Sequence, residues 1–203
     1  MLFRSRLVQA FSGATASLRA THQDGHPRED HSHTQQIPRR MEFHADLSAR
    51  AVLDTHALAW QPSPMPGVQR RMLDRQGGEV ARATSIVRYA PGSRFERHSH
   101  GGGEEILVLE GTFSDEHGHY GAGTYLRNPV GSSHAPFSEQ GCTILVKLRQ
   151  MHPADQQRLV VDTATSSWVP GLVKGLAVLP LHAYGSRSEE HTPELQSQFR
   201  ISY

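Results

Sequence analysis

Short apolar segments alternate with turn-forming stretches through residues 79–150, and this rhythm restricts the fold more than any other feature of the chain. The segments are β-branched or alternate between apolar and polar residues: EVARATSIVRYA, EEILVLEGTFSD, TYLRNPV and CTILVKLRQ. Turn sequences rich in Gly, Pro and Ser separate them at intervals of roughly 10 residues, which is typical of an antiparallel sandwich or small barrel. The pattern therefore predicts an all-β fold, either an antiparallel sandwich or a small antiparallel β-barrel.

The region before this rhythm is different in character. Residues 1–40 are polar and lack apolar periodicity, so we expect a disordered segment or a non-native extension, with Met41 as the natural start. The first residues also resemble an organelle transit peptide in their Arg, Ser and Ala content, although upstream translation is the favoured interpretation. Residues 41–78 predict a short helix or a strand pair before a Pro-rich stretch, and we assign 41–165 to the barrel.

The region after the barrel falls into two parts. Residues 166–185 repeat the Trp and Pro-Gly pattern of residues 60–73, which predicts the start of a second, truncated barrel. Within residues 186–203, the stretch RSEEHTPELQS is similar to a translated sequencing adapter. We therefore expect a disordered, adapter-derived tail without a function.

The composition excludes several classes of protein. The chain of 203 residues has a formal net charge of +1 and 20% charged residues, so its field favours neither nucleic acid nor a membrane surface as partner. Its single cysteine, Cys142, excludes an intrachain disulfide framework and a zinc finger, because each needs several thiols. No run of about 18 apolar residues is present in the sequence. We therefore expect a cytoplasmic protein.

Histidine is abundant, with 14 residues, and one block places two histidines at a fixed spacing from glycine and glutamate. The block contains Gly92, His98, His100, Glu104 and Gly111. Residues i and i+2 of a strand point to the same face, so the two imidazoles point together. The three glycines after His100 can form a turn that brings the Glu104 carboxylate beside them.

A second block supplies a third imidazole at a distance along the chain. It contains Gly123, Pro129, Gly131 and His134, with the histidine directly after a tight turn. Three imidazoles and one carboxylate can take four positions around a divalent ion and leave one or two open for water, substrate or dioxygen. Such ligands suit Zn, Fe, Mn, Ni or Co, whereas calcium and magnesium prefer oxygen ligands.

Other histidines carry less information. Pairs with the same spacing recur at residues 31–33 and 117–119, so a pair alone is weak evidence for a metal. We expect the histidines of 117–119 to be solvated in a hairpin, and His152 and His182 to lie at the surface.

Several other residues have two interpretations. Glu105 is the alternative to Glu104 as a ligand, but strand alternation places it on the opposite face. Cys142 opens a strand whose alternate residues are apolar, so a buried, inert thiol is expected. Three strand residues fit the barrel mouth and an exposed face equally well, and these are Tyr89, Tyr125 and Arg127.

The two blocks resemble the two sequence motifs of the cupin superfamily, whose members fold as small antiparallel barrels of the double-stranded β-helix or jelly-roll type. The surrounding stretches SIVRYAPGSRF, GGGEEILVLEGTFSDEHG and AGTYLRNPVGSSHAPFS resemble the ChrR-like cupin family more closely, over about residues 60–165. The resemblance implies metal ligands at His98, His100, Glu104 and His134. One departure is Ser138, which stands where the general cupin motif has Asn.

The resemblance implies more than one function. The ChrR-type anti-sigma factors carry an N-terminal zinc domain with a cysteine ligand, and residues 1–60 contain no cysteine. We therefore expect no sigma factor as partner, but a divalent-metal-binding cupin that senses, regulates or binds a small molecule. The alternative is an Fe(II)-dependent dioxygenase that cleaves diketones or hydroxyketones, as in similar stand-alone cupins. A third interpretation is an ion that only ties strands together. A homodimer is implied by resemblance alone.

Overall fold

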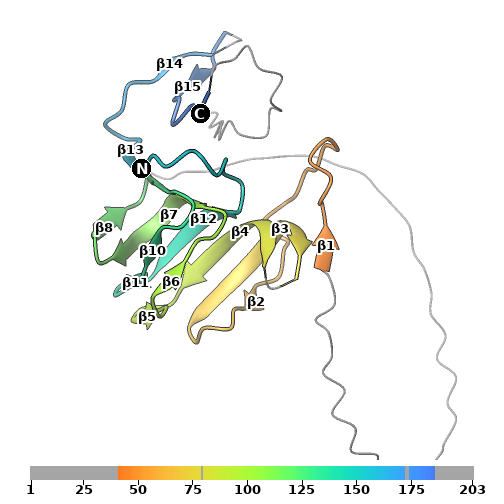
Figure 1. Ribbon diagram of the computed structural model, residues 1–203, viewed down its shortest axis with the longest axis vertical. Coiled ribbons are helices and arrows are strands. Elements are labelled where there is room, and N and C mark those ends of the chain that lie inside the picture. The colour runs from red at the N-terminus through yellow and green to blue at the C-terminus, as the bar shows by residue number, and fades with distance from the viewer. Residues whose placement is uncertain (1–40, 79, 172–173, 186–203) are drawn as a thin grey trace, which may run out of the picture. The chain divides into compact units, whose positions relative to one another are not determined.

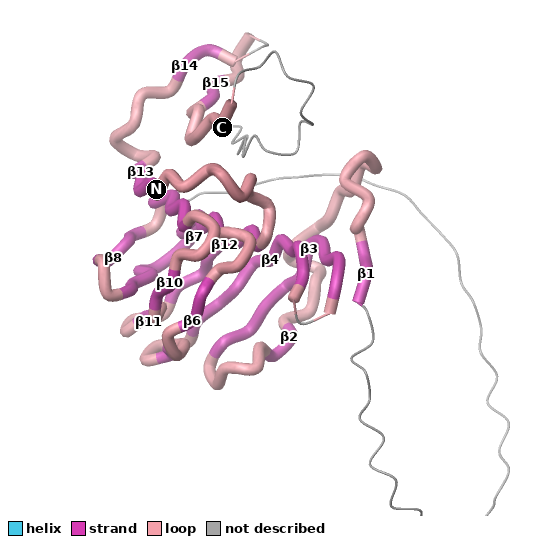
Figure 2. Tube along the Cα trace, viewed as in Figure 1, coloured by secondary structure: helices cyan, strands magenta, loops and turns pink. Residues whose placement is uncertain are grey.

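The computed structural model describes residues 41–78, 80–171 and 174–185. These residues form strands, turns and loops without any helix, as Figure 2 shows. Accordingly, the described part of the chain offers no helix that could span a membrane. The predictions for residues 1–40 and 186–203 lie outside the described residues. The predicted all-β antiparallel fold is confirmed.

Most strands belong to one antiparallel sheet, whose central order is β1, β3, β4, β12 and β7 (Figure 1). The strands are β1 (Met41–Phe43), β2 (Gln61–Pro62), β3 (Val68–Gly77), β4 (Ala81–Tyr89), β5 (Ser93–Arg94), β6 (His98–Ser99), β7 (Glu104–Asp115), β8 (Gly118–Gly121), β9 (Thr124–Asn128), β10 (Ser133–His134), β11 (Phe137–Ser138), β12 (Cys142–Leu148), β13 (Leu159–Asp162), β14 (Val169–Pro170) and β15 (Ala177–Val178).

The long strand β7 changes partners along its length. Residues 104–107 pair with β9, and residues 112–115 pair with the short strand β8. β11 joins β7 to β5, while β6 and β10 pair with each other. This change of partners turns the chain from one layer of the fold to the other, so that β6 and β10 lie in front of the central sheet in Figure 1.

Gly111 explains how β7 can bend at this point. Its φ is +71°, and an added Cβ would lie 2.2 Å from the carbonyl oxygen of Gly141. The register between β7 and β12 shifts close by, between Thr143 and Ile144. A left-handed backbone and a close backbone approach both favour glycine, which gives the spacing of the first block a structural meaning.

The core lies on the inward face of the central sheet. Alternate residues of β12, namely Cys142, Ile144 and Val146, are buried, as period-2 alternation predicts. They share one apolar cluster with Ile106 and Val108 of β7. Partly buried Phe95, which follows β5, packs against this cluster, so the core fills the space between the two layers. The expected burial of the Cys142 thiol is thereby confirmed.

The structure resolves some points that the sequence left open. The helix alternative within residues 41–78 is wrong, because this region forms β1, β2 and the long strand β3. The expected turn at residues 117–123 contains the short strand β8. Residues 166–185 contain β14 and β15, and their Leu179 and Leu181 share a second apolar cluster with strands β7 and β9. Their assignment to a second barrel stays a prediction.

Candidate metal centre

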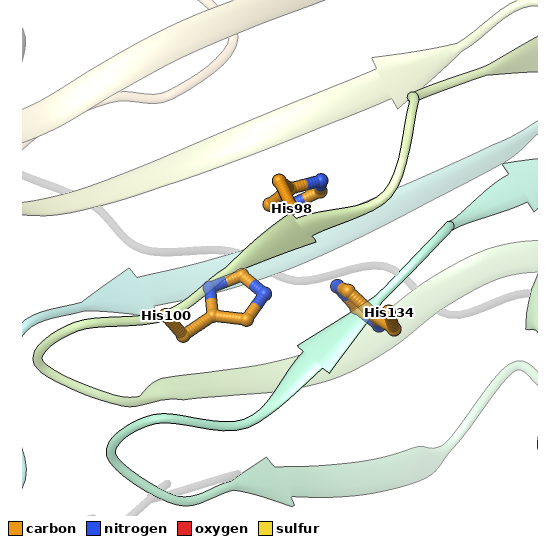
Figure 3. Close-up of side chains that lie close together, drawn as sticks. All are labelled: His98, His100 and His134. Carbon is orange, nitrogen blue, oxygen red and sulfur yellow. The ribbon is translucent and has the colours of Figure 1, made fainter.

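Three imidazoles come together on the paired strands β6 and β10. His98 and His134 lie directly opposite each other in the ladder, and His100 follows β6. Ring centroids are 4.9 Å apart for His98 and His100, 5.3 Å for His98 and His134, and 4.8 Å for His100 and His134. One ring nitrogen of each lies within 4.8 Å of those of the others, and Figure 3 shows the rings converging.

Glu104 lies beside two of these rings. One of its carboxylate oxygens, Oε2, is 3.4 Å from Nε2 of His100 and 3.3 Å from Nε2 of His134. The Asn128 side-chain amide donates a hydrogen bond of 3.1 Å to the same oxygen. Glu105 points elsewhere, since it accepts a 2.5 Å hydrogen bond from the Tyr125 hydroxyl. Strand alternation therefore separates the two carboxylates in the structure as it does in the sequence.

The glycine-rich turn between His100 and Glu104 is packed closely against the end of β12. An added Cβ at Gly102 would lie 2.6 Å from Cγ of Arg149, and one at Gly103 would lie 2.3 Å from the Met151 sulfur. Gly103 also has a φ of +77°. Side chains would force this turn away from β12, so glycine is what allows Glu104 to begin β7 beside the imidazoles.

The outer ring nitrogens of two histidines have partners of their own. Nδ1 of His98 lies 2.9 Å from the carbonyl oxygen of Glu96, and Nδ1 of His134 lies 3.2 Å from the Asp115 carboxylate. Such contacts orient a ring and direct its Nε2 to the opposite side. In both cases that side is the histidine cluster. Asp115 and Asn128 were not predicted from the sequence, because no local spacing connects them to the histidines.

Burial and neighbouring groups affect the protonation of His100 in the cluster and of Asp115 behind it. Burial lowers the pKa of His100, and the imidazoles of His134 and His98 lower it further, whereas the Glu104 carboxylate opposes them by raising it. A neutral imidazole is the form that binds a metal ion. Burial alone would raise the pKa of Asp115, but hydrogen bonds from His134, the His117 amide and Tyr120 hold it below its usual range. A charged carboxylate therefore faces His134.

The residues present fit a metal ion by one further observation. Nε2 of His100 and Nε2 of His134 are buried, and neither has a hydrogen-bond partner among the described residues. A buried polar nitrogen without a partner is costly, commonly by about 1–3 kcal/mol. An ion between these nitrogens, Glu104 and His98 would remove that cost. His98 is the most exposed of the three histidines, so the cluster is reached from that side.

A cavity of about 400 Å³ adjoins the cluster. His98, His100 and Glu104 contribute to its lining, and so does Tyr89, one of the residues with two interpretations. The other two, Tyr125 and Arg127, are buried outside this cavity. Tyr125 packs in the second apolar cluster, and Arg127 forms a 2.8 Å ion pair with Asp155.

The structure also shows the surroundings of the other histidines and of Ser138. His117 and His119 are exposed at the β7–β8 hairpin, as expected, whereas His182 is partly buried and lies 2.7 Å from the Asp155 carboxylate. Ser138, at the position where the general motif has Asn, donates a 2.6 Å hydrogen bond to the Thr112 carbonyl. Its side chain therefore holds β11 against β7.

An antiparallel two-layer β-fold with histidines and a glutamate clustered between its layers defines a cupin. The sequence model of the ChrR Cupin-like domain matches residues 48–152, just over half of the chain. This chain belongs to the family of ChrR cupin-like domains. The family and its histidine cluster together indicate a site for a divalent metal ion.

Solved structures include several similar chains. A chain in the complex of Rhodobacter sphaeroides SigE with the anti-sigma ChrR is 28% identical, and the match covers 47% of this chain and 50% of that one, with a TM-score of 0.40. An acetylacetone dioxygenase from Acinetobacter johnsonii is 18% identical over 49% of this chain and 72% of its own, with a TM-score of 0.41.

The polyketide cyclase RemF from Streptomyces resistomycificus is also similar. It is 17% identical, the match covers 58% of this chain and 88% of that one, and the TM-score is 0.42.

The region of this chain that matches the ChrR complex spans half the length of the matched chain in that complex. No curated protein matches the sequence.

Proposed function

We propose that this chain is a metal-dependent cupin that binds a small molecule beside the ion in a sensing or regulatory role. The ion would be held by His98, His100, Glu104 and His134. The observation that carries this proposal is a pair of buried Nε2 atoms that make no hydrogen bond to any described residue and lie 3.3 and 3.4 Å from one oxygen of the Glu104 carboxylate. Zinc and Fe(II) are the ions that this set of nitrogen and oxygen ligands suits best, with Mn and Ni as other candidates.

When bound, such an ion supplies a Lewis acid at the cavity. The chain's own residues have separate tasks. Glu96 and Asp115 orient two of the rings, and Asn128 orients the Glu104 carboxylate. The apolar walls of the cavity would exclude water from a ligand that approaches past His98.

The single cysteine, buried in the core, is consistent with a protein that functions in the reducing cytoplasm.

The test is metal content after purification and reconstitution. We expect about one equivalent of divalent metal by elemental analysis in the unaltered protein and almost none in the double variant His98→Ala/His134→Ala. The matched control is His117→Ala/His119→Ala, which removes a pair of exposed hairpin histidines. Thermal unfolding in EDTA shows that each variant is folded. Equal metal content in both double variants would refute the proposal.

An Fe(II)-dependent dioxygenase acting on a diketone or hydroxyketone is the second candidate. The observation that favours it is the apolar cavity directly beside His98 and His100, where a carbonyl compound could lie next to the ion. The protein is loaded with Fe(II) without oxygen, mixed with such ketones, and then followed by oxygen uptake. Uptake that requires both ketone and iron supports the enzyme, whereas tight ketone binding without uptake supports the sensor.

A further inference from the structure

The cavity beside the histidine cluster has apolar walls and an excess of positive charge. Val87 of β4 with Ile144 and Val146 of β12 form part of its wall. Glu104 is the only acidic side chain among its described lining residues, and it already contacts two imidazoles. The cationic side chains in the lining are Arg70, Arg75 and Arg149. A metal ion would add further positive charge, so the cavity favours an anionic occupant.

The three arginines differ in what they contact. Arg75 donates a hydrogen bond to the Gly78 carbonyl, and exposed Arg149 packs against the glycine-rich turn at Gly102. The Nε atoms of Arg70, Arg71 and Arg75 are all buried without a hydrogen bond in the part of the chain that the structure describes. Arg70 differs from the other two because no hydrogen bond, ion pair or ring contact joins its side chain to the described residues. A buried guanidinium nitrogen without a partner is unfavourable unless a ligand supplies one.

The register of β3 explains why Arg70 reaches the cavity. Arg70 pairs with Val87, a wall residue of the cavity, so the two side chains lie on the same face. Arg71 faces the other way, where its guanidinium carbon lies 4.2 Å from the centre of the Trp60 ring. Neighbouring arginines on one strand thus point to opposite faces, as strand alternation requires. The metal cluster and Arg70 come from different strands and share one cavity.

We propose that Arg70 recognises a carboxylate or similar anionic group of the ligand, while an oxygen at the other end of that ligand meets the metal and an apolar chain lies along the wall. The guanidinium group suits this task because it can donate two parallel hydrogen bonds to a carboxylate. This inference names the substrate class of the proposed function and rests on it. The ligand class is therefore a compound with a carboxylate at one end, an oxygen donor such as a carbonyl at the other, and an apolar chain between them.

The experiment compares a carboxylate with its neutral ester. The probes are 4,6-dioxoheptanoate and its methyl ester, titrated calorimetrically into the full chain loaded with Ni(II), with oxygen excluded so that no oxygenase reaction can occur. We expect the acid to bind about tenfold or more tightly than the ester, in keeping with a charged hydrogen bond in a cavity with apolar walls. Arg70→Gln should abolish this preference by weakening the acid alone, and Arg70→Lys should restore part of it.

Arg71→Gln is the matched control, because it removes an adjacent arginine that faces Trp60 instead of the cavity. It should leave the ratio of acid to ester unchanged. Equal affinities for acid and ester, no binding of the acid, or the same loss in both glutamine variants would overturn the proposal. Metal content is measured separately, and the titration is repeated on the metal-free protein. A preference for the acid there would support the role of Arg70 even if the metal assignment failed.

Discussion

Asp115→Asn tests whether the contact behind His134 controls metal affinity. Both oxygens of Asp115 accept hydrogen bonds, one from the His117 amide at 2.8 Å and the Tyr120 hydroxyl at 3.2 Å, the other from His134 at 3.2 Å. Asparagine has one acceptor oxygen and one donor NH2 group, so one of these donors must face another donor. The negative charge beside the imidazole is lost as well.

The expected loss in metal affinity is therefore large for a residue that does not touch the ion. Partners of metal-binding histidines commonly contribute 10- to 100-fold, and Asp115 is only 4% exposed, so solvent screens it little. We expect about 30- to 100-fold weaker zinc binding, or about 2–2.7 kcal/mol. The assay is competition with a chromophoric chelator at pH 7.5, with unfolding measured in EDTA to show that the variant is folded.

Glu116→Gln is the matched control for this prediction. Glu116 follows Asp115 in the sequence, but its carboxylate contacts the Arg97 guanidinium and the Ala135 amide instead of a histidine ring. We expect less than about a twofold change in zinc affinity for this variant. The reasoning would be refuted if Asp115→Asn bound zinc as tightly as the unaltered protein, or if both variants lost affinity equally.

Three further predictions concern stability and reactivity. Gly111→Ala should reduce the free energy of unfolding by about 3 kcal/mol in urea, because it adds a Cβ close to Gly141 at a positive φ, whereas Gly121→Ala, with open space around it, should have little effect. Burial lowers the pKa of His100 below 6.5, so the unfolded chain binds this proton at a higher pH than the folded protein does. The metal-free protein should therefore lose stability as the pH falls through about 6.5, and it should lose less in the variant His100→Gln. An equal pH dependence of the free energy of unfolding in both proteins would contradict this. Burial also raises the pKa of the Cys142 thiol, so iodoacetamide should label it slowly until denaturant is added, and fast labelling of the folded protein would count against this.

Some expectations failed because tertiary contacts override weak local signals. The segment of β3 is rich in arginine and glutamine, so its sequence VQRRMLDRQG does not look like a core strand. It pairs with β4 along almost its whole length, and its arginines either line the cavity or stack on Trp60. His182 was expected at the surface, but its imidazole lies beside the buried Asp155 carboxylate. Such pairings join residues that are far apart in the sequence.

The sequence by itself determined the all-β class and four main strands, and with the family resemblance it indicated the four candidate ligands. The strands follow from period-2 alternation and from glycine at turns, and His98, His100 and Glu104 follow from their short spacing, all of which act locally. His134 was indicated by its own block and by the resemblance. Only the tertiary structure decided which carboxylate contacts a histidine from behind and which arginines of β3 face the cavity. These depend on strand register, since a shift of one residue along β3 would place Arg71 or Gln69 on the face where Arg70 now meets the cavity.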